Sequence, residues 1–334
     1  MKLGSILIVT VFDWHRSILD PLVSRFRAWR DVDYASTDEI AHGWRPTREP
    51  DLVIVCDAGA VRGLRDFFPS ALFMHVGHGL ISKNQTAYHY READFVCVAS
   101  QHVVERLTDI GHAPRKRFFA TGLIQTDPLF TSRSSREKAR RSVCDSAVVY
   151  APTWNDSLTS AAMFGDALTE KIRGENNRIR VVIKPHPHIN VVRPEWIEMW
   201  SQMSQQFTNV ELLDPDSDLI PALLDADLMV SDASSAIFHF LALNRPIVLV
   251  NNPARFSDEN AFDPNGIEWL WRDMADEVET IDAVEEAVRR VLGDPKHREQ
   301  ERLHRRYQLF GGLTDGRSCE RVHSAAVHVL EKYQ

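Results

Sequence analysis

The sequence has few cysteines and no excess of basic residues. Its four cysteines are far apart and form no C-x-x-C pair, which excludes a zinc knuckle and a thioredoxin-type dithiol. Three of them lie in or beside apolar segments, which is typical of small buried residues in a reducing compartment. The formal net charge of −8 argues against a general nucleic-acid binder, so we expect no nucleic-acid partner.

Long apolar runs are also missing. The N-terminal apolar stretch, which ends at Phe12-Asp13-Trp14, is shorter than the roughly 20 residues of a membrane span and lacks the cleavage site of a secretory signal. No later apolar run approaches spanning length. We therefore expect a cytoplasmic protein.

The apolar runs that are present are short and separated by segments of helical length. They are continuous rather than alternating, which is typical of parallel strands covered on both faces, so they predict an α/β fold. The predicted strands are Ser5–Val11, Leu52–Cys56, Ala71–Val76, Phe95–Ala99, Phe118–Thr121, Ala147–Ala151, Val181–Lys184, Val210–Leu213, Leu228–Ser231 and Ile247–Val250. Predicted helices include Ser17–Trp29, Val103–Ile110, Ala236–Leu243, Ile281–Leu292, Lys296–Tyr307 and Ser318–Tyr333.

The length of 334 residues predicts two domains, because single cores stop growing at about 250–300 residues. A polar, basic stretch near Asp127–Arg141 separates the two groups of strands. We expect an N-terminal Rossmann-like acceptor domain over residues 1–130, a C-terminal Rossmann-like nucleotide-donor domain over 142–315, and a helix over 316–334 that could pack back on the first domain. Two Rossmann-like domains facing across a cleft would open the carboxyl ends of their strands into it, where α/β sheets bind ligands.

The first segment whose residues could carry out chemistry follows the predicted strand Ala71–Val76. Gly77 and Gly79 permit a tight turn that lets the backbone approach a ligand, and His78 stands between them. A histidine titrates near neutrality, so His78 is a candidate general base for an attacking hydroxyl. The alternative is a glycine turn with an incidental histidine. His75 lies inside the strand and is expected to be a core residue.

Two further segments follow strands of the second half. Thr153, in Tyr150-Ala151-Pro152-Thr153-Trp154, offers a hydroxyl for a phosphate or base, or belongs to a proline turn with a core tryptophan. In Lys184-Pro185-His186-Pro187-His188 two prolines hold the backbone extended. Its three basic side chains could stabilise the charge that develops on a diphosphate leaving group. The His-x-His spacing has no evident third ligand, so we predict no metal site.

Ser231, Asp232, Ser234 and Ser235 lie between a strand and a helical run. Such residues cap a helix N-terminus, and a helix N-terminus also binds phosphate; the two roles are compatible. The segment Asp315–Val322 predicts another helix start, with Asp315 or Ser318 as its cap.

In this order the segments resemble the CDP-glycerol glycerophosphotransferases of teichoic-acid and capsule synthesis. The likeness covers residues from about 71 to 325 and rests on six matches: a His-Gly loop with a following lysine at His78, Gly79 and Lys83; Gly122–Asp127; the intact Tyr-Ala-Pro-Thr-Trp of Tyr150–Trp154; His186-Pro187; Ser231–Ser235; and Asp315–Arg321.

The resemblance implies a two-domain glycosyltransferase-B fold, metal-independent inverting chemistry and no cofactor besides the donor substrate, CDP-glycerol or another nucleotide diphosphate conjugate. It implies that His78 is the general base and that His186, Ser234 and Ser235 hold the donor diphosphate. The remaining candidate donor-binding residues are Gly79, Lys83, Thr153, Lys184, His188, Ser231, Asp232 and Asp315.

Several positions depart from the family pattern near the expected donor site, which puts the identity of the donor in question. Gln125 and Asn155 stand where arginine is common, Ala233 replaces tyrosine, and His239 replaces an aspartate.

The predicted activity is transfer of a glycerol phosphate, or a related alditol phosphate, to a hydroxyl of a polyol, glycan or lipid-linked acceptor. A nucleotide-sugar glycosyltransferase would share the fold and the diphosphate site. A nucleotide-sugar 2-epimerase would need several carboxylates near the sugar ring, and the sequence shows no such cluster. A non-catalytic nucleotide-binding protein is a third alternative, against which His78 argues.

Membrane contact is a separate question. The basic residues Arg133, Arg136, Lys138, Arg140 and Arg141 would suit a peripheral contact with the anionic inner face of the cell membrane, or they form a solvated helix.

Overall fold

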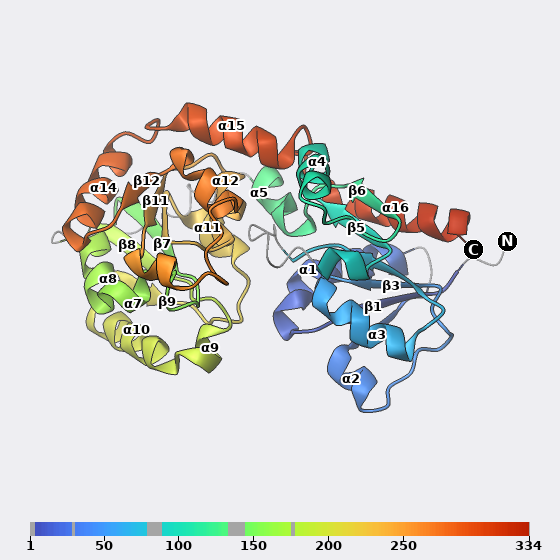
Figure 1. Ribbon diagram of the computed structural model, residues 1–334. Coiled ribbons are helices and arrows are strands. Elements are labelled where there is room, and N and C mark those ends of the chain that lie inside the picture. The colour runs from blue at the N-terminus through green and yellow to red at the C-terminus, as the bar shows by residue number, and fades with distance from the viewer. Residues whose placement is uncertain (1–3, 29–30, 79–88, 133–143, 175–177, 334) are drawn as a thin grey trace. The chain divides into compact units, whose positions relative to one another are not determined.

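The computed structural model describes residues 4–28, 31–78, 89–132, 144–174 and 178–333. The chain forms two compact units (Figure 1). Of the described residues, unit 1 comprises those in 4–78, 89–131 and 307–333, and unit 2 comprises those in 132–306. The division at residue 306 falls inside α15 (Glu299–Phe310), whereas the sequence places the second domain boundary at residue 315.

Unit 1 is built on a sheet of parallel strands in the order β2-β1-β3-β4-β5-β6. The strands are β1 (Ile6–Thr10), β2 (Asp33–Ser36), β3 (Leu52–Val55), β4 (Leu72–His75), β5 (Phe95–Val98) and β6 (Arg117–Ala120). The helices are α1 (Arg16–Arg27), α2 (Thr37–Ala41), α3 (Val61–Phe67), α4 (Gln101–Asp109), α5 (Asp127–Thr131) and α16 (Ser318–Tyr333), with short 3₁₀ turns η1 (Asp13–His15), η2 (Ala58–Ala60) and η4 (Ile124–Thr126).

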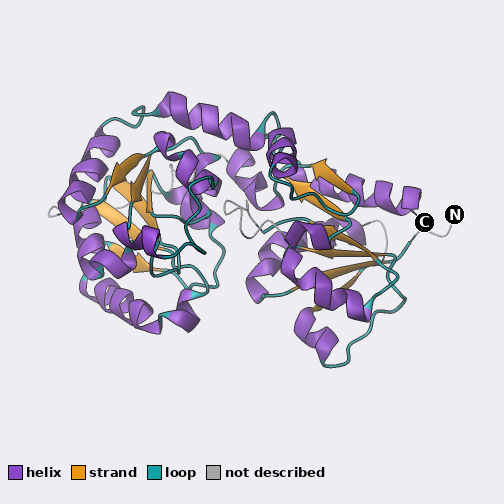
Figure 2. Ribbon diagram, viewed as in Figure 1, coloured by secondary structure: helices purple, strands orange, loops and turns teal. Residues whose placement is uncertain are grey.

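The core of unit 1 follows from the alternation of side chains along each strand. In β1, Ile6 and Ile8 belong to a buried cluster that also contains apolar residues of α1 and α16, while Leu7 and Val9 are buried on the opposite face. Because both faces are covered by helices (Figure 2), the strands read as continuous apolar runs rather than as alternating ones. The last helix of the chain thus completes the core that the first strand begins.

The N-terminus of α16 is capped by a residue that lies far away in the sequence. The backbone amides of Ser318 and Cys319 both donate to the carboxylate of Asp127, each at 3.0 Å. The sequence predicts Asp315 or Ser318 as this cap, and that prediction is wrong. Asp315 instead accepts from the Arg317 amide at 3.2 Å and pairs with Arg321.

Two glycines let the segment around Asp127 and the segment that begins α16 approach each other closely. Gly122 has φ +82° and Gly316 has φ +68°, a backbone conformation that side chains disfavour. A Cβ at Gly122 would also lie 2.2 Å from the Ser318 hydroxyl, and a Cβ at Gly316 would lie 2.2 Å from a methyl carbon of Thr131. The Gly122–Asp127 and Asp315–Arg321 segments therefore interlock within unit 1.

Unit 2 repeats the architecture with a parallel sheet in the order β12-β11-β10-β7-β8-β9. Its strands are β7 (Ser146–Ala151), β8 (Ile179–Ile183), β9 (Val210–Leu212), β10 (Leu228–Ser231), β11 (Ile247–Val250) and β12 (Asp276–Val278). Its helices are α7 (Ala161–Phe164), α8 (Asp166–Arg173), α9 (Ile189–Val192), α10 (Pro194–Gln206), α11 (Ile220–Asp225), α12 (Ala236–Leu241), α13 (Ile267–Leu270) and α14 (Ile281–Gly293), with 3₁₀ turns η5 (Pro253–Ser257) and η6 (Arg272–Met274). One face of the sheet packs on α8, α10 and α14 around the buried Trp200.

The ten strands predicted from the sequence are all present, with ends that shift by up to two residues. Two edge strands were not predicted, β2 with the sequence DYAS and β12 with the sequence DEV. Each pairs with a neighbour on one side only, so its sequence needs no continuous apolar run. The predicted linker Asp127–Arg141 begins with a helix, α5.

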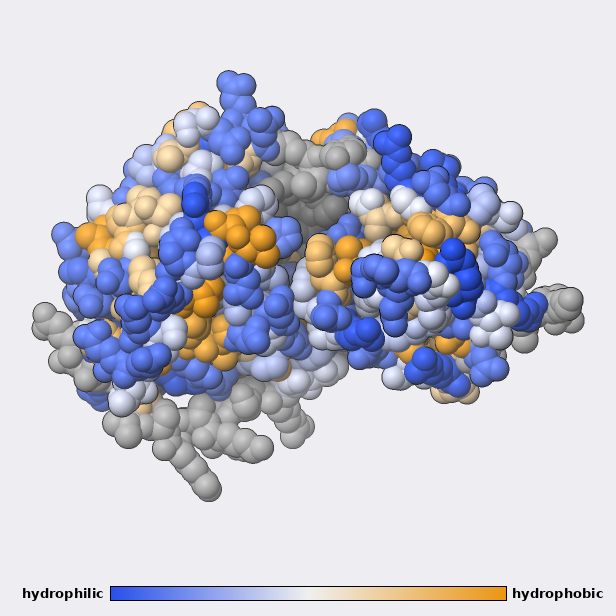
Figure 3. Space-filling model, turned by 90° about the horizontal axis from the view of Figure 1, so that it is seen from below, coloured by the Kyte–Doolittle hydropathy of each residue, from blue (hydrophilic) through white to orange (hydrophobic). Residues whose placement is uncertain are grey.

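The face shown in Figure 3 carries apolar residues in small patches among hydrophilic ones. Within the described part of the chain, no helix has the length and apolar character needed to cross a membrane.

We expect Asp127→Ala to lower the free energy of unfolding by about 1–2 kcal/mol, because it removes both hydrogen bonds at the start of α16. Asp127→Asn keeps one carbonyl oxygen and should recover part of the loss. Asp315→Ala, on the exposed turn before α16, is the matched control and should cost less. Urea denaturation of the three variants measures this. A larger loss in Asp315→Ala than in Asp127→Ala would show that the local cap is the important one.

Candidate functional site

Polar side chains of unit 1 gather where three neighbouring strands end. His15 follows β1, Asp57 follows β3, and His78 follows β4, and these strands lie side by side in the order β1-β3-β4. One ring nitrogen of each histidine and one carboxylate oxygen of Asp57 lie within 4.8 Å of one another. The carboxyl edge of the unit 1 sheet therefore carries a compact polar cluster.

The tautomer of His78 is set by the backbone. Its Nδ1 lies 2.6 Å from the carbonyl oxygen of Cys56, which can only accept a hydrogen bond. Nδ1 therefore carries the proton, and in the neutral ring Nε2 keeps its lone pair. His78 is partly exposed, and Gly77, with φ +73°, makes the turn just before it. Such a ring can take a proton at Nε2.

His75 donates to the same carbonyl. Its Nε2 lies 3.2 Å from the Cys56 oxygen, which thus accepts from two imidazoles. His75 is 2% exposed, as expected for a core residue, and its ring packs on Tyr90. Burial, assisted by the nearby His78, lowers the pKa of His75 to about 3. His75 is therefore neutral near pH 7 and orders the turn without exchanging protons.

His15 is fully buried beside His78, although it comes from another loop. The two rings are stacked with centroids 5.4 Å apart, and Trp14 packs edge-on against both. The His15 Nδ1 accepts from the backbone amides of Val11 and Phe12 at 3.3 and 3.5 Å. Burial, together with His78, lowers the pKa of His15 to about 3, so the ring is neutral.

His15, Asp57 and His78 are also a set of side chains that could hold a metal ion. The hydrogen bonds argue against it. A ligand Nε2 on His15 would need the proton on Nδ1, where two backbone N–H groups already point. The predicted donor-binding residues Gly79 and Lys83 lie outside the described residues.

In unit 2 the corresponding edge is organised by Asp232, which follows β10 and is fully buried. Its carboxylate accepts five hydrogen bonds at 2.8–3.2 Å. The donors are the amides of Thr153, Ser160 and Ala233 and the hydroxyls of Thr159 and Ser160. The pKa of Asp232 nevertheless lies above its usual range, because burial outweighs these bonds. Asp232 fixes the loops after β7 and β10 to each other.

Arg272 also stabilises the loop that contains Asp232. Its Nη2 donates to the backbone carbonyl of Asp232 at 2.7 Å, and the guanidinium lies 4.3 Å from the Trp269 ring centre. Burial lowers the pKa of Arg272 to about 10, which leaves it charged at neutral pH. Ser231 is also held internally, since its hydroxyl donates to the Ala151 carbonyl at 2.6 Å.

His186 lies beyond β8, the neighbour of β7. Its Nδ1 accepts from the backbone amide of His188 at 3.2 Å, so a neutral His186 carries its proton on Nε2 and is a hydrogen-bond donor there. The ring of His188 packs between those of His186 and Trp154, with centroid distances of 5.1 and 5.5 Å. The Pro185–Pro187 turn thus places a histidine that is protonated at Nε2 at the carboxyl edge of the sheet.

Lys184 is turned inward. It is 5% exposed, and its Nζ donates to the carbonyls of Pro185 and Pro215 at 3.1 and 2.6 Å. Burial lowers its pKa to about 8, although Asp214, Asp216 and Asp218 favour the charged form. Lys184 ties the loop after β9 to the loop after β8.

Ser234 and Ser235 lie between β10 and α12, as the sequence predicts. The Ser234 hydroxyl accepts from the Ala236 amide at 3.3 Å, whereas Ser235 occupies the cap position without a side-chain cap bond. Ser234 is buried and Ser235 is partly exposed. Their loop follows β10, a central strand of the sheet, and is joined to Thr153 by the hydrogen bond from the Thr153 amide to Asp232. Asp315, another predicted donor-binding residue, belongs to unit 1.

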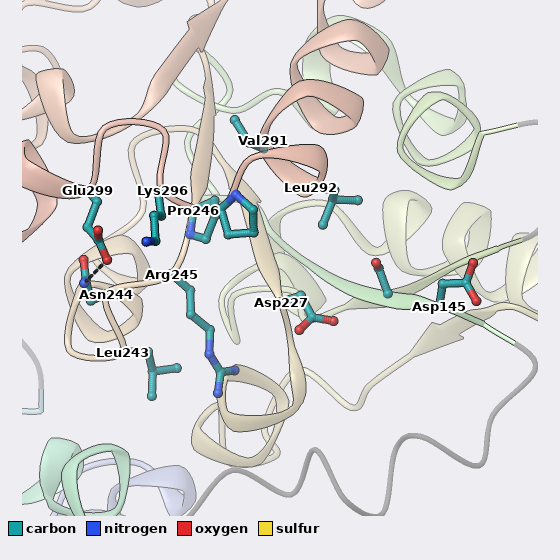
Figure 4. A pocket seen from close by; sticks show the side chains of 12 residues that line it. Asp145, Asp227, Leu243, Asn244, Arg245, Pro246, Val291, Leu292, Lys296 and Glu299 are labelled. Carbon is teal, nitrogen blue, oxygen red and sulfur yellow. Dashed lines mark hydrogen bonds between the residues drawn. The ribbon is translucent and has the colours of Figure 1, made fainter.

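A pocket of about 470 Å³ lies at the opposite edge of the unit 2 sheet (Figure 4). It is lined by Asp145 before β7, Asp227 before β10 and Pro246 before β11. Asn244 donates to Glu299 at 3.4 Å within this lining. These are the amino ends of the strands, so this pocket is distinct from the loops that carry His186 and the serines.

Several residues of these loops were not predicted. Asp57 directly follows a predicted strand and His15 follows the first one, so the rule that singled out His78 could have found both. Asp127 and Arg272 act through contacts with residues far away in sequence, for which the chain gives no local signal.

Two Rossmann-like units, each with its polar loops at the carboxyl edge of a parallel sheet, define a glycosyltransferase-B-type α/β protein. Solved structures share the fold. The wall teichoic acid polymerase TagF matches with a TM-score of 0.68 at 12% identity, covering 100% of this chain and 90% of that one. Staphylococcus aureus MnaA, solved with UDP, matches with a TM-score of 0.60 at 15% identity, covering 98% and 97%.

The Methanocaldococcus jannaschii UDP-GlcNAc 2-epimerase, solved with UDP-GlcNAc and UDP, also matches, with a TM-score of 0.60 at 13% identity over 97% of this chain and 99% of that one. No protein with a curated description matches the sequence significantly. The chain belongs to the CDP-glycerol:poly(glycerophosphate) glycerophosphotransferase family, whose model matches residues 73–328.

The buried His75 makes the free energy of unfolding depend on pH. Between its unfolded pKa of about 6.5 and its folded pKa of about 3, the unfolded chain binds one proton more than the folded chain. This group's contribution to the free energy of unfolding therefore falls as the pH falls, by about 2 kcal/mol from pH 7 to pH 5. His75→Gln can still donate to the Cys56 carbonyl but cannot titrate.

We therefore expect the free energy of unfolding of His75→Gln, measured with urea at pH 7, 6 and 5, to decline less steeply than that of the wild type. His304→Gln, at an exposed position of α15, is the control substitution. Parallel pH profiles for wild type and His75→Gln would show that His75 is not held neutral.

Proposed function

We propose that the protein transfers glycerol phosphate from CDP-glycerol to a hydroxyl acceptor in the synthesis of a cell-surface polymer of the teichoic-acid type. Membership of the glycerophosphotransferase family supports this reaction class. The observation that carries the proposal is the hydrogen bond from His78 Nδ1 to the Cys56 carbonyl, which leaves Nε2 as a base at a loop of the carboxyl edge.

In the proposed reaction His78 Nε2 takes the proton of the acceptor hydroxyl. The acceptor oxygen attacks the β-phosphorus of CDP-glycerol, and the bond from this phosphorus to the bridging oxygen breaks. CMP leaves with the electron pair of that bond, and the glycerol phosphate remains on the acceptor as a phosphodiester. The proton then passes from His78 to the solvent, which restores the base before the next acceptor binds.

Unit 2 would stabilise the negative charge on the leaving CMP. We propose that His186 Nε2–H, the Ser234 and Ser235 hydroxyls and Thr153 contact the donor diphosphate, with His188 and Trp154 packed beside them. Asp232, Ser231 and Lys184 would position these loops, since their polar atoms bond to neighbouring segments. α12 has only six residues, so the donors rather than its dipole would carry most of the effect.

The proposed acceptor is a hydroxyl of a polyol, glycan or lipid-linked polymer. Contact with the inner face of a membrane would fall to the basic segment 133–141, which lies outside the described residues. We propose no cofactor and no metal, because imidazole and hydroxyl donors supply the positive potential that a metal otherwise provides.

The test is nucleotide release. The protein is incubated with CDP-glycerol and a short poly(glycerol phosphate) acceptor in EDTA, and released CMP is measured. We expect acceptor-dependent CMP release that EDTA leaves unchanged. His78→Ala should lower turnover by about 10²–10⁴-fold while the far-UV circular dichroism spectrum stays the same.

UDP-sugars and CMP-sugars serve as alternative donors, and the donor is recorded with each product. UDP release from a UDP-sugar would indicate glycosyl transfer, and an interconverted sugar would indicate an epimerase. Either result without CMP release from CDP-glycerol would contradict the proposal. Activity that disappears in EDTA and returns with a divalent metal would contradict its metal-independent part.

The donor site is tested by replacing Ser234 and Ser235 together with alanine. Each hydrogen bond to a charged phosphate is worth roughly 1.5–3 kcal/mol, so affinity for CDP should fall at least about tenfold. Affinity for CMP should fall less, because CMP lacks the second phosphate. Calorimetric titration with CDP, CMP, UDP and UMP measures both.

The matched control is the double variant Ser201→Ala/Ser204→Ala on α10, away from the carboxyl edge. Thermal denaturation of both variants separates lost capping at α12 from lost binding. If the Ser234/Ser235 variant binds CDP as tightly as the wild type, the two serines serve only the start of the helix.

A further inference from the structure

His15 is a buried histidine, and only one of its two ring nitrogens has a hydrogen-bond partner among the described residues. It lies in η1 after β1, is 0% exposed, and is enclosed by the rings of Phe12, Trp14 and His78. Its Nδ1 accepts from two backbone amides. Its Nε2 is buried and has no hydrogen-bond partner among the described residues.

The tautomer of His15 follows from these contacts. Backbone N–H groups can only donate, so Nδ1 is unprotonated and the neutral ring carries its proton on Nε2. Burial keeps the ring neutral at physiological pH. The result is a buried N–H without a partner in the described part of the chain, which is rare in folded proteins.

The neighbouring His78 has the opposite tautomer. Its Nδ1 is protonated and its Nε2 holds a lone pair. A ring nitrogen of His15, a ring nitrogen of His78 and a carboxylate oxygen of Asp57 all lie within 4.8 Å of one another. One oxygen atom at about 2.9 Å from each nitrogen would span that separation. A hydroxyl oxygen fits, because it can accept from one nitrogen and donate to the other.

We infer that His15 is a positioning residue for the acceptor, whose Nε2–H donates to the acceptor hydroxyl oxygen and so directs the hydroxyl proton at His78 Nε2. This inference rests on the proposed role of His78 as general base. His15 exchanges no proton itself. Its ring is fixed by the backbone of β1 and by Trp14, so the hydroxyl would be held by an ordered donor.

A metal bound to the same three side chains is the competing explanation. It would require a lone pair on His15 Nε2 and hence a proton on Nδ1, facing the Val11 and Phe12 amides. The Asp57 carboxylate also already accepts from the Gly59 amide at 2.8 Å. The hydrogen-bond pattern therefore favours a hydroxyl over a cation, and the metal becomes an outcome of the test.

The experiment compares His15→Phe with His15→Gln. Phenylalanine keeps a planar ring but removes the donor, whereas the Gln amide nitrogen lies near the place of Nε2 and can donate. Initial rates are measured with the donor nucleotide that supports transfer in the wild type, over a range of acceptor concentrations. Affinity for CDP is measured by calorimetry. His42→Phe, at an exposed position beside α2, is the control.

We expect His15→Phe to lower kcat/KM for the acceptor by about 10- to 100-fold with unchanged affinity for CDP, and His15→Gln to recover most of the loss. Equal losses in both variants would show that His15 only fills space and would overturn the inference. So would unchanged acceptor kinetics in His15→Phe.

Loss of wild-type activity in EDTA, with recovery by manganese or zinc in the wild type but not in His15→Phe, would identify a metal site instead. If transfer uses a donor other than CDP-glycerol, the proposed function fails while the comparison of His15 variants still decides the role of His15. The two failures are therefore distinguishable.

Discussion

A polar group that is removed from water must find a partner inside the protein, and this requirement shapes the carboxyl edge of both sheets. The Asp232 carboxylate accepts five hydrogen bonds, and the Cys56 carbonyl accepts two from imidazoles. Each of these acceptors joins loops that follow different strands. The loops are thereby held in place by bonds that involve no ligand, which is the condition for an ordered binding surface.

The same hydrogen bonds distinguish the residues that support the loops from those proposed to take part in the reaction. Lys184, Ser231 and Asp232 form hydrogen bonds to neighbouring backbone or side chains. Their geometry explains why the loops are ordered and does not itself indicate a chemical role. His78 and His186 differ, because in each ring one nitrogen is engaged by the backbone and this fixes the protonation of the other. The backbone sets opposite tautomers, a lone pair on His78 Nε2 and a proton on His186 Nε2. These are the states that a base and a stabiliser of negative charge require.

The fold could be predicted from the sequence because buried parallel strands must be apolar on both faces. For that reason the sequence predicts the strands Leu52–Val55 and Ile247–Val250. It does not predict the edge strands Asp33–Ser36 and Asp276–Val278. The carboxyl-edge loops could be predicted as well, since polar residues directly after such runs stand out. What a side chain bonds to could not be predicted. Lys184 has the sequence context of a phosphate ligand, yet its Nζ points to backbone carbonyls that only the folded chain brings near.

The capping of α16 by Asp127 bears on how the chain is made. Unit 1 contains the first strand and the last helix, while residues 132–306 of unit 2 are synthesised between them. On a ribosome, unit 2 can complete its sheet while the unit 1 core still exposes the apolar surface that α16 will cover. Unit 1 thus depends on α16, and a nascent protein stalled before residue 318 would present that surface to chaperones and proteases.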